Sequence, residues 1–72
     1  MIELVVISAL LLGSGEVKTD ESIIRKVDNL NTCFALRDLY MNSPILVNTH
    51  KTYLKGKYGN NESVERFICQ VS

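Results

Sequence analysis

Seventy-two residues allow one small domain, and a domain of this size buries a thin core that often needs a crosslink, a metal or a partner. Hydrophobic residues make up 46% of the chain, which excludes a disordered protein, and eight Lys and Arg balance eight Asp and Glu, which argues against a general polyanion binder. We therefore expect a single folded domain over residues 1–72 and no nucleic-acid partner.

The chain opens with the apolar stretch IELVVISALLLGSG, residues 2–15. Its uncharged run, residues 4–15, is 12 residues long, whereas a membrane span needs about 20. The length suits a signal peptide cleaved after GSG, but no Lys or Arg precedes the run and Glu3 cancels the terminal charge. β-branched residues and a glycine break favour a buried strand or core segment instead. We expect a cytoplasmic protein without a stable membrane span; the alternative is a secreted or periplasmic protein that loses its first 15 residues.

The next segment has the pattern of a long helix near residues 20–42. Thr19 or Asp20 would cap its start. Apolar residues then recur at helical spacing, namely Ile23, Val27, Leu30, Phe34 and Met41. The helix should end at Asn42-Ser43-Pro44, because proline disfavours helical geometry in the residue before it.

The stretch PILVNTHKTYL, residues 44–54, allows two interpretations. Ser43 and Pro44 suit the N-cap and first position of a second helix. The β-branched residues that follow, bounded by proline and glycine, favour a strand. We expect a strand through Val47.

The last predicted element is a short helix capped by Asn60 or Asn61. Its apolar residues fall at helical spacing: Val64, Phe67, Ile68 and Val71. The predicted order is strand, helix, strand, helix, which indicates a small single α/β or α+β domain. The alternative is a small all-α, disulfide-linked bundle that follows a signal peptide.

Three segments carry a resemblance to a known family: IELV at the start, LRDLYMNSPILVNTHKTY in the middle, and NNES. Together they resemble the front half of phage-encoded M15-type peptidases, which have the D-alanyl-D-alanine or hedgehog-like peptidase fold. In that family a helix ending in Leu-Arg leads through a small-Pro-Ile turn into a strand reading Val-Asn. Here those positions are similar to Leu36-Arg37, Ser43-Pro44-Ile45 and Val47-Asn48.

The resemblance covers only the non-catalytic part of such an enzyme. A zinc peptidase needs a cluster of His and Asp ligands and a carboxylate base. The single histidine, His50, falls in the expected strand and not at a ligand position, and the family's Ser-x-His and Gly-x-Ala-x-Asp motifs would lie beyond residue 72. We expect no catalytic residues, no metal, no cofactor and no zinc-dependent hydrolase activity.

Cys33 and Cys69 are too far apart in sequence to form a C-x-x-C pair. With His50 they would make a three-ligand zinc set without a close ligand pair, so two buried small hydrophobic residues are the simpler interpretation. We expect free thiols in a reducing cytosol. In an exported chain the two cysteines would be joined.

The segment HKTYLKGKY, residues 50–58, is the most distinctive surface feature, because no acidic residue occurs between Asp38 and Glu62. Interleaved lysines and tyrosines can contact acidic groups, and a solvated run of like charges has the same pattern. The candidate partner-binding residues are His50, Lys51, Tyr53, Lys55, Lys57 and Tyr58. We predict a small non-catalytic interaction protein, a truncated relative of a phage cell-wall peptidase, that binds a protein partner. The alternative is an exported two-cysteine helical inhibitor or immunity-type protein.

Overall fold

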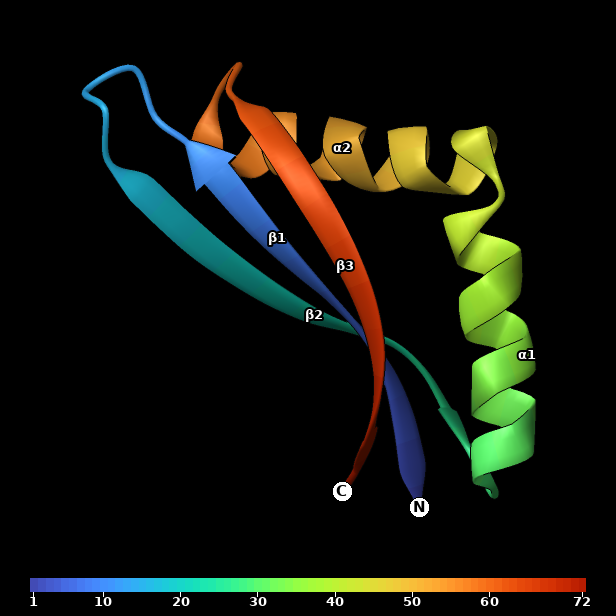
Figure 1. The fold of residues 1–72 in the computed structure, drawn as a ribbon. Coiled ribbons are helices and arrows are strands. Elements are labelled where there is room, and N and C mark those ends of the chain that lie inside the picture. Colours follow the sequence, from blue (N-terminus) through green and yellow to red (C-terminus); the bar gives the residue numbers. More distant parts are fainter.

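The computed structural model describes residues 1–72 as a three-stranded antiparallel sheet with two helices on one face (Figure 1). The elements are β1 (Ile2–Leu11), β2 (Val17–Val27), α1 (Leu30–Met41), α2 (Pro44–Tyr58) and β3 (Glu62–Val71). The α+β class is confirmed. The predicted order of strand, helix, strand, helix is wrong, because the observed order is β-β-α-α-β. The all-α alternative is wrong as well.

β1 is the central strand of the sheet, which has the order β2-β1-β3. The prediction of a buried strand at the start of the chain is confirmed, and the strand continues to Leu11. Leu4, Val5 and Val6 are fully buried although successive residues point to opposite faces. A central strand with neighbours on both edges explains why this stretch is apolar almost without interruption.

Residues 17–27 form β2 and not the first half of a long helix, so the prediction of a helix from Thr19 or Asp20 is wrong. The GSG turn reverses the chain, with Gly15 in the left-handed region at φ +88°, and lays this segment along β1. A bulge interrupts the pairing between Leu4 and Val5. The extra residue brings Ile24 and Val27, three apart, to the same core, which resembles helical spacing in sequence.

α1 begins at Asn29, whose side-chain oxygen accepts a hydrogen bond from the Thr32 N–H at 2.9 Å. It ends at Met41, as the prolyl turn predicts. Leu36 and Tyr40 face the core, where the Tyr40 ring lies 5.8 Å from that of Phe67.

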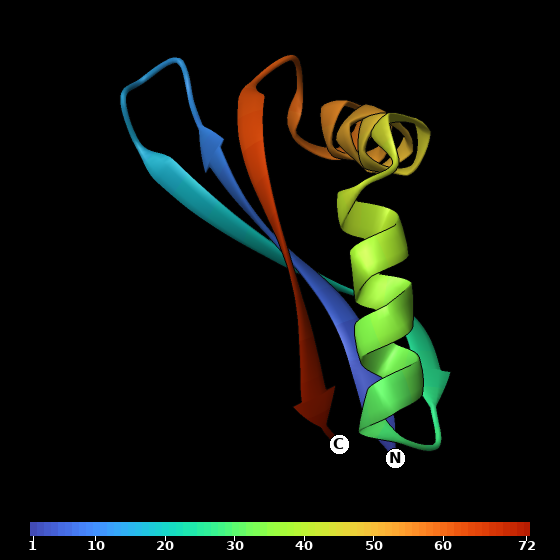
Figure 2. The same cartoon turned by 45° about the vertical axis from the view of Figure 1, so that its right-hand side comes forward.

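Residues 44–58 form a helix, α2, so the prediction of a strand through Val47 is wrong. Ser43 caps the helix by accepting a hydrogen bond from the Leu46 N–H, and Pro44 occupies its first turn. These local signals outweigh the β-branched residues, whose strand preference depends on an available sheet edge. α2 crosses one end of the sheet, whereas α1 covers the other end (Figure 2).

Residues 62–71 form β3, so the prediction of a helix capped at Asn60 or Asn61 is wrong. The strand pairs with the second edge of β1, where Val5 lies opposite Ile68 and Val6 opposite Phe67. The sequence spacing suggested one apolar helix face. In the strand, however, Phe67 points to the helices whereas Val64 and Ile68 point to the other face.

The main core lies between the sheet and α1, and it is closed by a disulfide. Its buried members are Ile2, Leu4, Val6, Cys33 and Phe67. Cys33 of α1 is bonded to Cys69 of β3, with the two Cα atoms 6.1 Å apart. The prediction of free thiols is therefore wrong, because the fold brings two distant cysteines together inside the core.

Candidate functional site

The six candidate partner-binding residues all lie on α2, between its middle and its carboxyl-terminal end. Sequence analysis placed them on an extended or looped segment. On a helix they point in several directions, and the structure separates those that hold α2 against the sheet from those that face solvent.

His50 contacts the sheet. Its Nε2 lies 3.2 Å from the hydroxyl oxygen of Ser8, a fully buried residue of β1. The imidazole thereby supplies the hydrogen-bond partner that a buried hydroxyl requires. The ring also lies 5.6 Å from that of Tyr53. His50 thus serves the packing of α2.

Lys51 is paired with a buried carboxylate. Its ammonium nitrogen lies 2.6 Å from Oε1 of Glu65 on β3, and it donates a hydrogen bond to the carbonyl oxygen of Ser63. The Glu65 side chain is only 2% exposed, and its two oxygens accept no hydrogen bond of good geometry besides this ion pair. The buried charge therefore depends on Lys51 for its neutralisation.

Lys57 and Tyr58 converge on Asp20 of β2. The Tyr58 hydroxyl donates a hydrogen bond to Asp20 Oδ1, Lys57 Nζ lies 3.2 Å from the same oxygen, and Ser22 donates to Oδ2. The hydrogen bond from Tyr58 is the largest cause that lowers the pKa of Asp20, and Lys57 lowers that pKa further. In turn, the hydrogen bond that each makes with Asp20 raises the pKa of Lys57 and of Tyr58. We call these residues, Asp20, Ser22, Lys57 and Tyr58, the Asp20 cluster.

Tyr53 and Lys55 are the two predicted residues that make no hydrogen bond or ion pair with the sheet. Lys55 is exposed and makes no ion pair, and the Tyr53 side chain is half exposed. Lys55 and Lys57 occupy the last turn of α2, where a positive charge interacts favourably with the helix dipole. The partner-facing part of the basic segment is therefore smaller than the sequence suggested.

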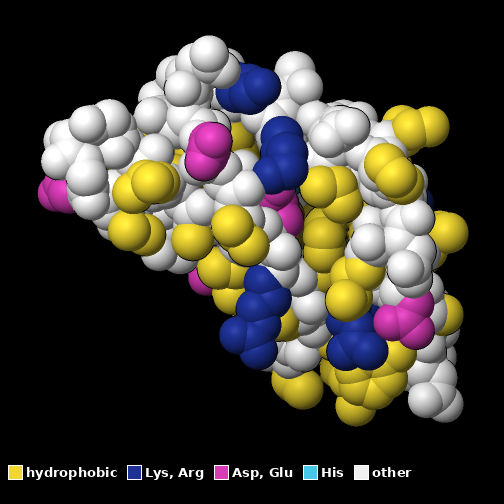
Figure 3. Space-filling model, turned by 45° about the horizontal axis from the view of Figure 1, so that its top comes forward, with side chains coloured by type: hydrophobic (Ala, Val, Ile, Leu, Met, Phe, Trp, Pro, Cys, Tyr) yellow, Lys and Arg dark blue, Asp and Glu magenta, His cyan; other side chains and the backbone are white.

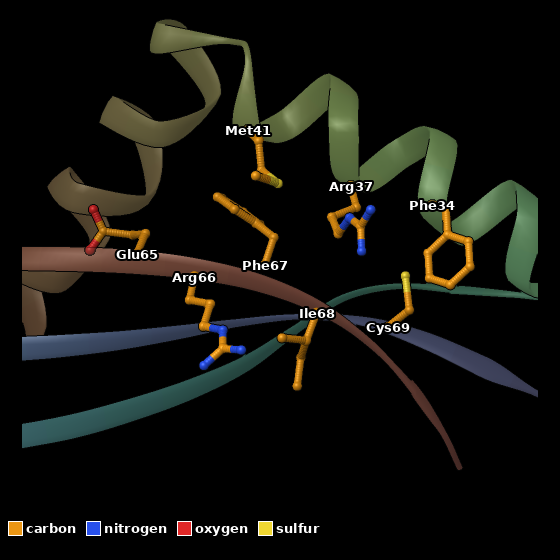
Figure 4. A pocket seen from close by; sticks show the side chains of 8 residues that line it. All are labelled: Phe34, Arg37, Met41, Glu65, Arg66, Phe67, Ile68 and Cys69. Carbon is orange, nitrogen blue, oxygen red and sulfur yellow. The ribbon is translucent and has the colours of Figure 1, made fainter.

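A groove lies between α1 and β3, with a volume of about 530 Å³. Phe34, Arg37 and Met41 extend from α1 toward β3, and Phe67 and Cys69 form its apolar floor (Figure 4). Arg66 and Ile68 point away from α1, to the far side of the strand. Arg37 Nε is buried in the structure without a hydrogen-bond partner, while its Nη2 lies 3.4 Å from the Asp38 carboxylate.

The face of the sheet opposite the helices carries no covering element; we call it the open face. Its apolar members come from all three strands and include Ile7, Leu11, Val17, Ile23, Val64 and Ile68. Ile23 is 54% exposed and Val64 74%. Figure 3 shows hydrophobic side chains gathered over the sheet and again over the helices, with charged side chains between them.

The structure places no group of three or more His, Cys, Asp or Glu side chains where they could hold a metal ion. Cys33, His50 and Cys69 cannot form the zinc site considered from the sequence, because Cys33 and Cys69 are bonded to each other and offer no thiolate. None of the helices has the length and apolar character needed to cross a membrane.

Comparisons of this chain with protein families, curated proteins and solved structures find no match. The resemblance to the front half of M15-type peptidases stays a prediction. One of its elements does not hold, since Val47-Asn48 lies in helix α2 and not in a strand.

Sequence analysis missed the groups that the basic residues contact. Asp20 and Glu65 are buried acids on β2 and β3, far from α2 along the chain. The sequence pattern predicts a helix around both Asp20 and Glu65, and in those helices neither acid would lie beside Lys51 or Lys57. No sequence signal separates Asp20 and Glu65 from the exposed Glu21 and Glu62 on the same strands.

Proposed function

We propose that this chain is a non-catalytic, disulfide-stabilised domain that binds a protein partner. The observation that carries the proposal is the distribution of apolar side chains. Twelve large hydrophobic residues are exposed, whereas the buried hydrophobic residues number eight. Exposed apolar side chains that lie together, as those of the open face do, are typical of a surface that contacts another protein.

The open face contributes four of these exposed residues, Leu11, Val17, Ile23 and Val64, and the helices contribute six. The helices expose Leu39, Met41 and Ile45, the last with 78% of its area in solvent. Tyr53 and Lys55 of α2 are exposed as well. The proposal therefore moves the partner contact from the whole basic segment to these apolar surfaces and to the solvent-facing part of α2.

The test is affinity purification of the tagged chain from its native host, followed by reconstitution with the purified partner. Ile23→Lys combined with Val64→Lys should abolish recovery of a partner that the unmodified chain retains. Thr19→Lys is the matched control, because it adds a charge to the same face without removing an apolar side chain. Equal recovery with the double variant, at an unchanged melting temperature, would contradict the open face as the contact. Failure to recover any partner above background would contradict the proposal itself.

The contribution of the basic segment is tested by Tyr53→Ser and Lys55→Ser, which remove no hydrogen bond or ion pair between α2 and the sheet. A triple replacement of Lys51, Lys55 and Lys57 is not a clean test, because two of these lysines neutralise buried acids. Weaker partner binding in the Tyr53 and Lys55 variants supports the segment as part of the interface. Unchanged partner binding would show that the segment is not part of the interface.

The disulfide favours an exported version of this function, since such bonds persist mainly in oxidising compartments. This observation supports the secreted or periplasmic alternative over a cytoplasmic protein. In this version of the function the chain is not cleaved after Gly15, because cleavage would remove β1, the strand that pairs with both β2 and β3. The fold described here is that of the uncleaved chain. Alkylation of denatured protein taken directly from the host checks the bond: two labelled thiols without prior reduction would contradict it.

A further inference from the structure

β3 has a free edge along the groove beneath α1. The strand order places β1 on one side of β3 and no strand on the other. The Ser72 N–H donates a hydrogen bond to the Met1 carbonyl oxygen at 3.0 Å. The backbone N–H and C=O groups of successive residues point to opposite edges of a strand. Those of the even-numbered residues of β3 therefore point toward β1. The N–H and C=O groups of Glu65, Phe67 and Cys69 therefore point outward. None of them makes a hydrogen bond beyond the sheet.

The groove supplies an apolar wall beside this edge. Phe34 and Met41 of α1 overhang the edge, and both side chains are exposed. A strand laid against β3 would direct every second side chain toward this wall and the others toward the open face. Apolar side chains fit the first set of positions, since Phe34, Met41 and Phe67 surround them.

The charged side chains at the edge of β3 indicate which side chains of an added strand would face the open side. Arg66 projects to the open side of β3 and makes no ion pair within the chain. Arg37 lies on the groove side, where its Nη2 is 3.4 Å from the Asp38 carboxylate. The carboxylate in the same groove, Glu65, is already paired with Lys51. Free positive charge therefore remains on the open side of β3, and carboxylates complement it.

We propose that the free edge of β3 and the groove beneath α1 bind an extended segment of a partner protein, which adds as a fourth strand and alternates apolar and acidic residues. This mode of recognition gives affinity through main-chain hydrogen bonds and specificity through alternate side chains. It rests on the proposed function and assigns that function a site and a ligand chemistry.

A second copy of this chain does not fit the same edge. Antiparallel pairing of two β3 strands about Phe67 would place Arg66 opposite Ile68 and diagonal to its counterpart, where the two long cationic side chains come within reach and repel each other. It would also place two α1 helices over one groove. Self-association of the free protein through β3, seen by sedimentation and lost on Arg66→Glu, would overturn the proposal.

The probe is a synthetic peptide of alternating Glu and Val, about ten residues long to match β3. We expect saturable binding at neutral pH, with the Glu65, Phe67 and Cys69 amides protected from hydrogen exchange. A peptide with Lys in place of Glu should bind at least about tenfold more weakly, because it reverses the charge that faces Arg66. The same Glu-Val peptide with N-methylated valines should also lose binding, because it cannot complete the ladder. No binding of the Glu-Val peptide, or equal binding of all three, would overturn the proposal.

Protein variants provide the second arm. Arg66→Glu should weaken peptide binding at least about tenfold and remove its salt dependence. Arg25→Glu is the matched control, since Arg25 is an exposed arginine on the opposite edge strand. Phe34→Ser should weaken binding, whereas Leu39→Ser on the outer side of α1 should not. If the peptide fails while the host partner is still lost on Ile23→Lys with Val64→Lys, the site is wrong and the proposed function stands.

Discussion

Asp20 holds the carboxyl-terminal end of α2 to β2, and its ionisation links the stability of the fold to pH. The pKa of Asp20 is lowered in the folded chain, first by the hydrogen bond from Tyr58 and then by Lys57. A lowered pKa means that the unfolded chain binds this proton more tightly. The cluster therefore stabilises the fold above the ordinary pKa of 3.8, and this contribution is lost as pH falls through the lowered value.

We predict that Asp20→Asn lowers the free energy of unfolding at pH 7 by about 1–3 kcal/mol, the cost of weakening a buried charged hydrogen bond. The difference from the unmodified protein should shrink as pH falls below about 4, where Asp20 becomes protonated first in the unfolded chain and then, at lower pH, in the folded one. Urea denaturation from pH 2 to pH 7 measures this. Asp28→Asn is the control, because Asp28 is exposed and has no partner. A difference that stays constant down to pH 2 would contradict the assignment.

The same cluster sets an alkaline limit. The pKa of Tyr58 is raised above 10.0, chiefly by its hydrogen bond to Asp20, which requires the phenol to keep its proton. A raised pKa stabilises the fold below the ordinary value, and this stabilisation is lost as pH rises through the raised one. We predict that Tyr58→Phe abolishes the loss of stability that accompanies phenolate formation. Thermal unfolding between pH 8 and pH 11, with Tyr53→Phe as the control, decides this.

Lys51 and Lys55 lie one turn apart on α2, yet they should differ sharply in importance. Lys51→Met leaves the Glu65 carboxylate buried without a cation, and we expect the free energy of unfolding to fall by about 2–4 kcal/mol. Lys55→Met removes an exposed charge without a partner and should change stability by less than about 0.5 kcal/mol. Urea denaturation at neutral pH measures both. Adding Glu65→Gln to Lys51→Met should recover part of the loss, and no recovery would show that the ion pair is not its source.

Among the elements, α1 and β3 depend on each other through the disulfide. Cys33 and Cys69 are 36 residues apart, and closing such a loop contributes about 4 kcal/mol in the chain-entropy model. We predict that Cys33→Ala with Cys69→Ala lowers the free energy of unfolding by about that amount. After reduction of its disulfide, the unmodified protein should have the same free energy of unfolding as the double variant. A reduced protein as stable as the oxidised one would contradict this role.

The elements that sequence analysis predicted correctly are those specified by local chemistry. The apolar run of β1 and the prolyl turn after Met41 need no distant information. Ser43 and Pro44 also carried the correct helix signal, which was outweighed in the prediction by β-branched residues. β2 and β3 were wrong because their conformation depends on pairing with β1. The spacing of Ile24 and Val27 acquires its meaning only from a bulge that the partner strand imposes.

At the scale of the whole molecule, the central position of β1 makes the chain intolerant of losing its first segment. We predict that a chain starting at Glu16 does not fold, because β2 and β3 are separated from each other by β1. Circular dichroism should show loss of cooperative unfolding, with removal of Met1 alone as the control. A cooperative transition in the shortened chain would contradict the assignment of β1 as the centre of the sheet.

The six residues that the sequence singled out do not form one surface, and their role in binding stays a prediction. All six predicted side chains lie on one helix, yet His50, Lys51, Lys57 and Tyr58 contact the sheet. Sequence cannot distinguish a solvated lysine from one that neutralises a buried acid, because the acid lies on a distant strand. The groove and the open face depend on three strands and on α1, so no single segment revealed them.

The position of β3 determines the order in which a newly made chain can be completed. β1 can pair with β2 as soon as the hairpin has left the ribosome, but Leu4 must wait for Cys69. Until then the second edge of β1 stays open, and Cys33 remains a single reactive thiol in an unfinished core. Pairing between residues so distant in sequence is intrinsically slow. The nascent protein is therefore most exposed to aggregation and to mixed disulfides in the interval before its last strand is synthesised.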